Sequence, residues 1–168
     1  MRTGLQLLIA TVALAVLAGC GGSSKSEPAA AVGADFAAKA LAVCDTAVKD
    51  KQGWATFPVS DFDPSKPDAT KLPQVSAWLE DQVAPTFHTW LNDLKALGTP
   101  PSAPAAWNSM LAAVEKIARL NDDQIAAAKA GDTDGFATAT SGLATAQDDL
   151  VSTSAAAGVP ACADVHAA

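Results

Sequence analysis

A chain of 168 residues with a formal net charge of −7 allows one small domain and excludes a nucleic-acid role, since its 11 lysines and arginines form no basic cluster. The hydrophobic fraction of 49% is too high for a disordered chain, yet 39 residues are alanine and only 5% are aromatic. Strands favour β-branched and aromatic residues, in which this chain is poor. The composition therefore favours helices around a core of small side chains with a few large anchors.

The first twenty residues predict export and lipidation. An apolar run that is short for a membrane-spanning helix follows Arg2 and ends in Leu17-Ala18-Gly19-Cys20. This segment resembles a bacterial lipoprotein signal peptide with its lipobox. The resemblance implies that residues 1–19 are removed and that Cys20 becomes the lipidated N-terminus, on the outer face of the cell membrane, or at the outer membrane of a Gram-negative cell. An ordinary signal peptide and a single-span anchor are the alternatives.

Residues 20–34 predict a flexible tether, because they are rich in glycine, serine and alanine and show no apolar period. We assign residues 35–168 to the folded domain. An acidic chain is repelled by anionic lipid, so the acyl chains on Cys20 have to supply its membrane affinity. The membrane is thus the first predicted partner.

The cysteine count predicts one disulfide. Lipidation consumes Cys20 and leaves the pair Cys44 and Cys162 in an exported protein. A redox pair or a metal-thiolate site is the alternative, but neither cysteine belongs to a Cys-x-x-Cys motif, and the histidine closest to either of them in sequence is His166. We predict no metal site and no cofactor.

The first helix is predicted from Asp35, a candidate N-cap, to about Lys51, with Gly53 as a stop signal and Cys44 on the face toward the core. Residues 53–72 then predict a long loop, whose length favours it as a seat of function.

Within this loop, residues 61–65 resemble a calcium-binding loop only faintly. Lys66 stands in place of the turn glycine, and Leu72 in place of the bidentate glutamate. Solvated turns are the better interpretation of the aspartates in this stretch.

The second helix, from about Pro73 to Leu97, carries apolar residues three or four positions apart throughout. Pro85 lies inside it and predicts a kink or break near residues 81–84, because proline removes a backbone hydrogen bond. His88 falls opposite the apolar stripe, where a surface position is expected.

Two further helices are punctuated by proline and glycine. The third is predicted to begin near Ser102-Ala103-Pro104 and to stop before Gly131. The fourth begins after the caps Asp132 and Thr133 and ends before Gly158.

Polar residues interrupt the apolar stripes of these two helices. Asn121 lies in the stripe of the third helix, and Thr140, Gln147 and Ser154 lie in that of the fourth. These residues either line a small cavity or hydrogen-bond across the helix pair, and we favour the second interpretation because alanine-rich helices pack closely. Antiparallel pairing sets position 121 opposite about 142, which predicts a hydrogen bond between Asn121 and Thr140.

The short turns and the disulfide together predict an all-α fold, namely an antiparallel four-helix bundle with a proline-kinked second helix. The whole chain also resembles small, alanine-rich, helical lipoproteins of high-GC Gram-positive bacteria, whose function is unknown. The matching features are the lipobox, Cys44 in the first helix, and the segments 97–101, 130–132 and 158–162. The resemblance implies no activity.

No catalytic motif is recognisable, and the members of the acidic pairs Asp122-Asp123 and Asp148-Asp149 point about 100° apart on a helix. We therefore predict a non-enzymatic envelope module that contacts another envelope protein. The alternative is a carrier with a small-ligand pocket above about 300 Å³ between its helices. Its expected lining is Trp78, Trp90, Trp107 and Asn121, of which Trp78, Trp90 and Asn121 are the candidate ligand or partner contacts.

Overall fold

The computed structural model describes residues 31–165, and this part of the chain is helical without any strand, as the composition predicted. The predicted signal peptide, the predicted lipidation site Cys20, the first residues of the predicted tether and His166 lie outside the described residues. The elements in chain order are α1 (Ala34–Gln52), α2 (Leu72–Trp78), the π-helical turn η1 (Leu79–Val83), α3 (Ala84–Ala96), α4 (Pro104–Ala130), α5 (Thr133–Ala157) and the 3₁₀ helix η2 (Pro160–Val165).

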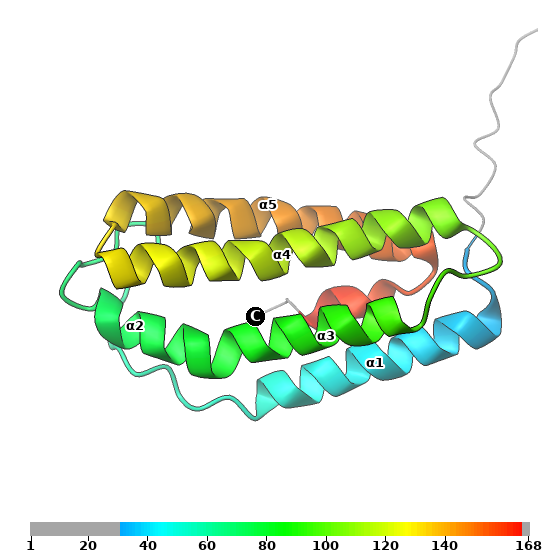
Figure 1. Ribbon diagram of the computed structural model, residues 1–168, viewed down its shortest axis with the longest axis horizontal. Coiled ribbons are helices and arrows are strands. Elements are labelled where there is room, and N and C mark those ends of the chain that lie inside the picture. Colours follow the sequence, from blue (N-terminus) through cyan, green and yellow to red (C-terminus); the bar gives the residue numbers. More distant parts are fainter. Residues whose placement is uncertain (1–30, 166–168) are drawn as a thin grey trace, which may run out of the picture.

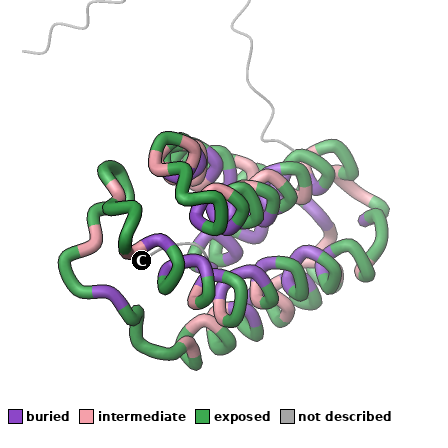
Figure 2. The backbone as a smooth tube through the Cα atoms, turned by 60° about the vertical axis from the view of Figure 1, so that its left-hand side comes forward, coloured by how far each residue is buried: buried purple, intermediate pink, exposed green. Residues whose placement is uncertain are grey.

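The long helices lie side by side with roughly parallel axes (Figure 1). Helix α4 packs beside α5 and also contacts α2 and α3, while α1 packs beside α3. The short helix η2 contacts both α1 and α5, the first and the last of the long helices. The loop between α1 and α2 is largely exposed, but Val59 within it is buried (Figure 2).

The helix boundaries follow the proline and glycine signals. Helix α4 begins at Pro104 and ends at Ala130, and its C-cap is Gly131, whose φ of 69° only glycine adopts readily. At the start of α5, the side chain of Asp132 accepts a hydrogen bond from the Gly135 backbone N–H at 2.9 Å, as the predicted cap requires.

The cap predicted for α1 is wrong. The helix begins at Ala34, its N-cap is Gly33, and no side chain caps it. Asp35 lies instead in the first turn, where its carboxylate faces the positive end of the helix dipole.

The predicted second helix is divided. A π-helical turn over Leu79–Val83 separates α2 from α3, and its last backbone bond runs from the Ala84 N–H to the Leu79 carbonyl. Pro85 follows directly and has no N–H to continue the α-helical ladder. The irregularity expected at residues 81–84 is therefore present, and it includes one extra residue in a turn.

The predicted disulfide between Cys44 and Cys162 is confirmed. It joins α1 to η2 across a sequence separation of 118 residues, and both cysteines are buried. Part of the predicted tether lies against the folded domain. Val32 is buried, and its N–H donates to the Ala157 carbonyl at 3.2 Å.

Candidate functional site

Trp90 and Trp107 lie in the core, not in a pocket. Their exposed fractions are 1% and 0%, and Phe36 packs edge-on to Trp107 with 4.8 Å between ring centroids. The indole Nε1 atoms of both residues are buried and have no hydrogen-bond partner among the described residues. These two tryptophans fill volume in the core and do not line the pocket described next.

A pocket of about 420 Å³ opens where the end of α1, the loop and η1 meet α3 and α4. We call it the tryptophan pocket. It contains Trp78 and Asn121, two of the four residues expected in a cavity, and adds five others. Its lining is Lys51, Trp54, Trp78, Leu79, Val83, Phe87 and Asn121.

The two tryptophan rings of this pocket are held in place by hydrogen bonds. Trp54 Nε1 donates to Thr86 Oγ1 and Trp78 Nε1 donates to the Ala55 carbonyl, each at 2.9 Å. The rings meet edge to face, with centroids 5.6 Å apart and planes at 85°. Because their N–H groups are engaged, the rings offer the pocket apolar surface.

Trp54 was missed by sequence reasoning. It lies in the loop, outside any helical period, so no apolar stripe includes it. The signal that could have identified it is the concentration of aromatic residues in a polar loop. Of the chain's nine aromatic residues, Trp54, Phe57 and Phe62 are in this segment.

These loop aromatics attach the loop to the helices. Phe57 packs edge-on to Trp78 at 5.1 Å and also contacts Phe62, which in turn packs edge-on to Phe136 of α5 at 5.7 Å. The Ala55 N–H donates to Gln82 Oε1 at 3.1 Å. The long loop is therefore anchored at several points beside the pocket.

Two polar groups belong to the pocket lining. Asn121 is 4% exposed, and its Nδ2 donates to the Ile117 carbonyl one turn earlier at 3.0 Å. The Lys51 ammonium lies 6.0 Å from the centroid of the Trp54 ring, and burial lowers the pKa of this lysine.

The hydrogen bond predicted between Asn121 and Thr140 is wrong. Thr140 Oγ1 accepts instead from Gln124 Nε2 at 2.8 Å. The predicted register was close, because a side chain added at Gly142 would meet Leu120. The rotation of α4 about its own axis was not predicted correctly. Asn121 faces the pocket, and Gln124, three residues later, faces α5.

The loop aspartates form turns, as their surroundings suggested. The hydroxyl and then the N–H of Ser65 donate to Asp63 at 2.6 and 2.9 Å, and Thr70 binds Asp68 in the same way. These bonds lower the pKa of both aspartates. The contribution of these hydrogen bonds to stability is present near neutral pH and is lost as the pH falls through the lowered pKa values.

Within residues 31–165, no three histidine, cysteine or acidic side chains are grouped as metal ligands.

The other candidate groups form exposed ion pairs. His88 Nε2 lies 3.0 Å from Asp122 Oδ1, and Lys116 Nζ lies 2.9 Å from Asp149 Oδ2. Each of these side chains is at least one-third exposed, so the pairs contribute little to stability.

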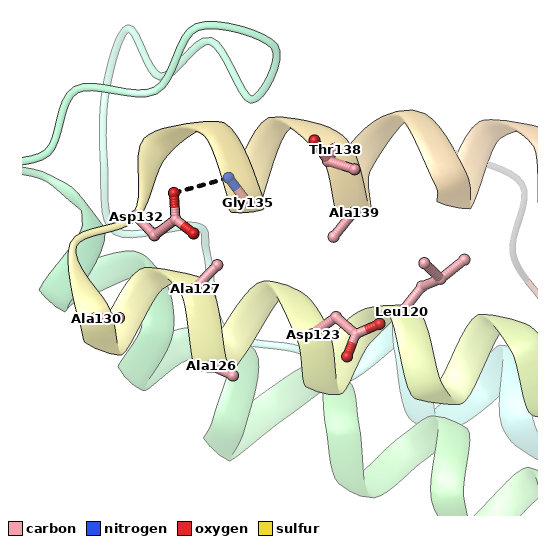
Figure 3. Close-up of a pocket in the computed structure, with 9 residues that line it drawn as sticks. All are labelled: Leu120, Asp123, Ala126, Ala127, Ala130, Asp132, Gly135, Thr138 and Ala139. Carbon is pink, nitrogen blue, oxygen red and sulfur yellow. Dashed lines mark hydrogen bonds between the residues drawn. The ribbon is translucent and has the colours of Figure 1, made fainter.

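A second hollow, of about 500 Å³, lies between α4 and α5 (Figure 3). Alanines and Gly135 form much of its wall, and Asp123 and Asp132 are its two carboxylates. Asp132 is already the cap of α5. This groove therefore offers little beyond small side chains and one further carboxylate.

No protein-family model, curated protein or solved structure matches the chain. Among residues 31–165, no helix combines the length and the apolar character that a bilayer crossing needs.

Proposed function

We propose that the protein is a lipid-anchored, extracytoplasmic, non-enzymatic module that binds a small molecule in the tryptophan pocket. The observation that carries this proposal is the pocket itself, with a volume of about 420 Å³ and two tryptophan rings fixed by hydrogen bonds. Ligand sites are typically concave, mostly apolar and equipped with a few polar groups. The lining has this character, with five apolar residues beside Asn121 and Lys51.

The lining favours binding over catalysis. It holds no carboxylate, histidine, hydroxyl or thiol, and Lys51 is its one ionisable residue. General acid–base and nucleophilic catalysis most often combine several ionisable or nucleophilic side chains at the reacting atoms. In place of several such catalytic groups, the pocket offers aromatic ring surface and the Asn121 amide.

A small ligand now takes precedence over the envelope-protein partner that the sequence favoured. Protein interfaces are built around contiguous apolar patches. Among the described residues, Phe57 of the loop and Val151 of α5 are the large hydrophobic side chains that are exposed. They belong to different elements, which favours the pocket as the binding site.

We further propose that the helices form an antiparallel four-helix bundle, in which α2, η1 and α3 act as one proline-kinked rod. Ion pairs along α4 support this arrangement. As the residue number rises from Glu80 to Lys95, the partner on α4 falls from Lys129 to Glu115. Carbodiimide cross-linking should join Glu80 to Lys129 and Lys95 to Glu115, whereas a link from Glu80 to Lys116 would contradict the arrangement.

The lipid anchor is tested at Cys20. Incorporation of radiolabelled palmitate and partitioning into the detergent phase should both be lost in Cys20→Ala, because this cysteine is the predicted site of acylation. Equal labelling of the variant and the wild type would refute the anchor.

The binding role is tested with the full chain in lipid nanodiscs. A collection of small ring compounds that are neutral, cationic or anionic would be screened by saturation-transfer NMR, with empty nanodiscs as the reference. Binders should be lost in Trp78→Ala and retained in the matched control Val151→Ala, which removes an apolar side chain on α5. A screen in which no compound distinguishes these two variants would contradict the proposal.

A further inference from the structure

The walls of the tryptophan pocket offer apolar ring surface to a ligand. Both indole N–H groups donate to protein acceptors, Thr86 Oγ1 and the Ala55 carbonyl. The rings of Trp54 and Trp78 stand nearly perpendicular, and Phe87 is tilted by 57° from Trp54 at 6.3 Å. Aromatic rings prefer offset or edge-to-face packing against such surfaces, so a flat ring compound suits this corner.

The charge environment disfavours a charged ligand of either sign. A cation would bind the ring faces only without a competing positive charge, and the Lys51 ammonium lies 6.0 Å from the Trp54 ring. An anion could pair with the Lys51 ammonium, but it would have to approach a chain of net charge −7 and lose its hydration, a cost that can exceed the gain from a partly buried ion pair. The pocket is therefore matched to an uncharged molecule.

One polar group of the lining, the Asn121 amide, could orient a ligand in the pocket. Asn121 donates through Nδ2 to the Ile117 carbonyl, which leaves its amide oxygen Oδ1 as the atom that can accept a hydrogen bond. The residue is more than nine-tenths buried and belongs to the lining. A buried carbonyl of this kind favours a ligand that carries a donor.

The volume sets the size of the ligand. About 420 Å³ lies toward the small end of the range that ligand pockets cover, roughly 300 to 1,000 Å³. A compound of one or two fused rings is in keeping with this space.

Resting on the proposed function, we propose that the tryptophan pocket binds a neutral, planar compound of one or two rings. The compound packs against Trp54 and Trp78 and donates one hydrogen bond to Asn121 Oδ1.

The probe for this proposal is indole, which is neutral, planar and bears one N–H donor. The full chain in nanodiscs would be labelled with 5-fluorotryptophan, so that its four tryptophans give four fluorine signals, assigned by single Trp→Phe variants. Indole should shift the Trp54 and Trp78 signals in a saturable manner and leave those of Trp90 and Trp107 in place. The two core signals also report whether each variant is folded.

Three analogues of indole separate the parts of the proposal. Benzofuran has nearly the same shape but an oxygen in place of the N–H, and should bind about fivefold more weakly, as expected for one neutral hydrogen bond. This difference should vanish in Asn121→Leu. Tryptamine and indole-3-acetate, which are cationic and anionic, should bind more weakly than indole.

The outcomes distinguish this inference from the proposed function. If tryptamine or indole-3-acetate shifts the pocket signals and indole does not, the ligand class is wrong while the binding role stands. Equal binding of indole and benzofuran to the wild type would overturn the role of Asn121. If none of the four compounds shifts Trp54 or Trp78, the inference is overturned, and if the wider screen also finds no binder, the proposed function fails with it.

Discussion

The four tryptophans divide into two pairs that the chain uses in opposite ways. Trp90 and Trp107 are buried in the core with unpartnered N–H groups, whereas Trp54 and Trp78 are half-buried with their N–H groups hydrogen-bonded. The core pair contributes apolar area in a domain rich in alanine, and that gain outweighs the cost of two unsatisfied donors. The pocket pair buries less area, but its rings are fixed in orientation. Burial of a ring thus serves stability here, while a fixed and accessible ring suits the proposed binding role.

The largest expected effect on the core comes from the disulfide. Replacing both Cys44 and Cys162 by alanine should lower the free energy of unfolding by about 4–5 kcal/mol, because the bond closes a long loop in the unfolded chain. Urea denaturation of the two proteins, followed by circular dichroism, measures the difference. A loss below about 1 kcal/mol would show that the bond constrains the unfolded state far less than this entropy model requires.

Replacing one tryptophan of each pair by alanine tests the difference between the two pairs. Trp107→Ala should cost about 3–5 kcal/mol, because it leaves a cavity in the packed core. Trp78→Ala should cost less than half as much, since its side chain is already partly exposed, although it loses the bond to Ala55. Equal losses in the two variants, measured by urea denaturation, would contradict the division into core and pocket pairs.

A smaller effect distinguishes two buried amides on α4. Gln124 bridges to Thr140 of α5, whereas Asn121 bonds within its own helix and faces the pocket. A double-mutant cycle with Gln124→Leu and Thr140→Val should give a coupling of about 0.5–1.5 kcal/mol. The same cycle with Asn121→Leu should give less than about 0.3 kcal/mol, and the reverse ranking would restore the pairing predicted from the sequence.

The helices and the disulfide were predictable because their signals are local or countable. Pro104, Gly131 and Gly158 mark helix ends through backbone conformations that other residues resist, and the predicted lipidation of Cys20 would leave an even number of cysteines. The register of α4 against α5 followed from the short turn between them.

The pocket was predictable only in part. The apolar stripe of the predicted second helix is buried on both sides of the π-helical turn at Leu79–Val83. Trp90 belongs to this stripe, whereas Trp78 lies beside it, so the two residues end in different environments although the sequence grouped both as contacts. Trp54 comes from the loop and reaches the pocket through tertiary contacts that no local period encodes.

The division between the two tryptophan pairs is tested most directly by hydroxyl-radical footprinting of the full chain in nanodiscs, with oxidation of each tryptophan read by mass spectrometry. Trp54 and Trp78 should be oxidised several-fold faster than Trp90 and Trp107, because only the first pair has exposed ring surface. Equal rates for all four residues, or faster oxidation of Trp90 or Trp107, would contradict the existence of an accessible tryptophan pocket beside a closed core.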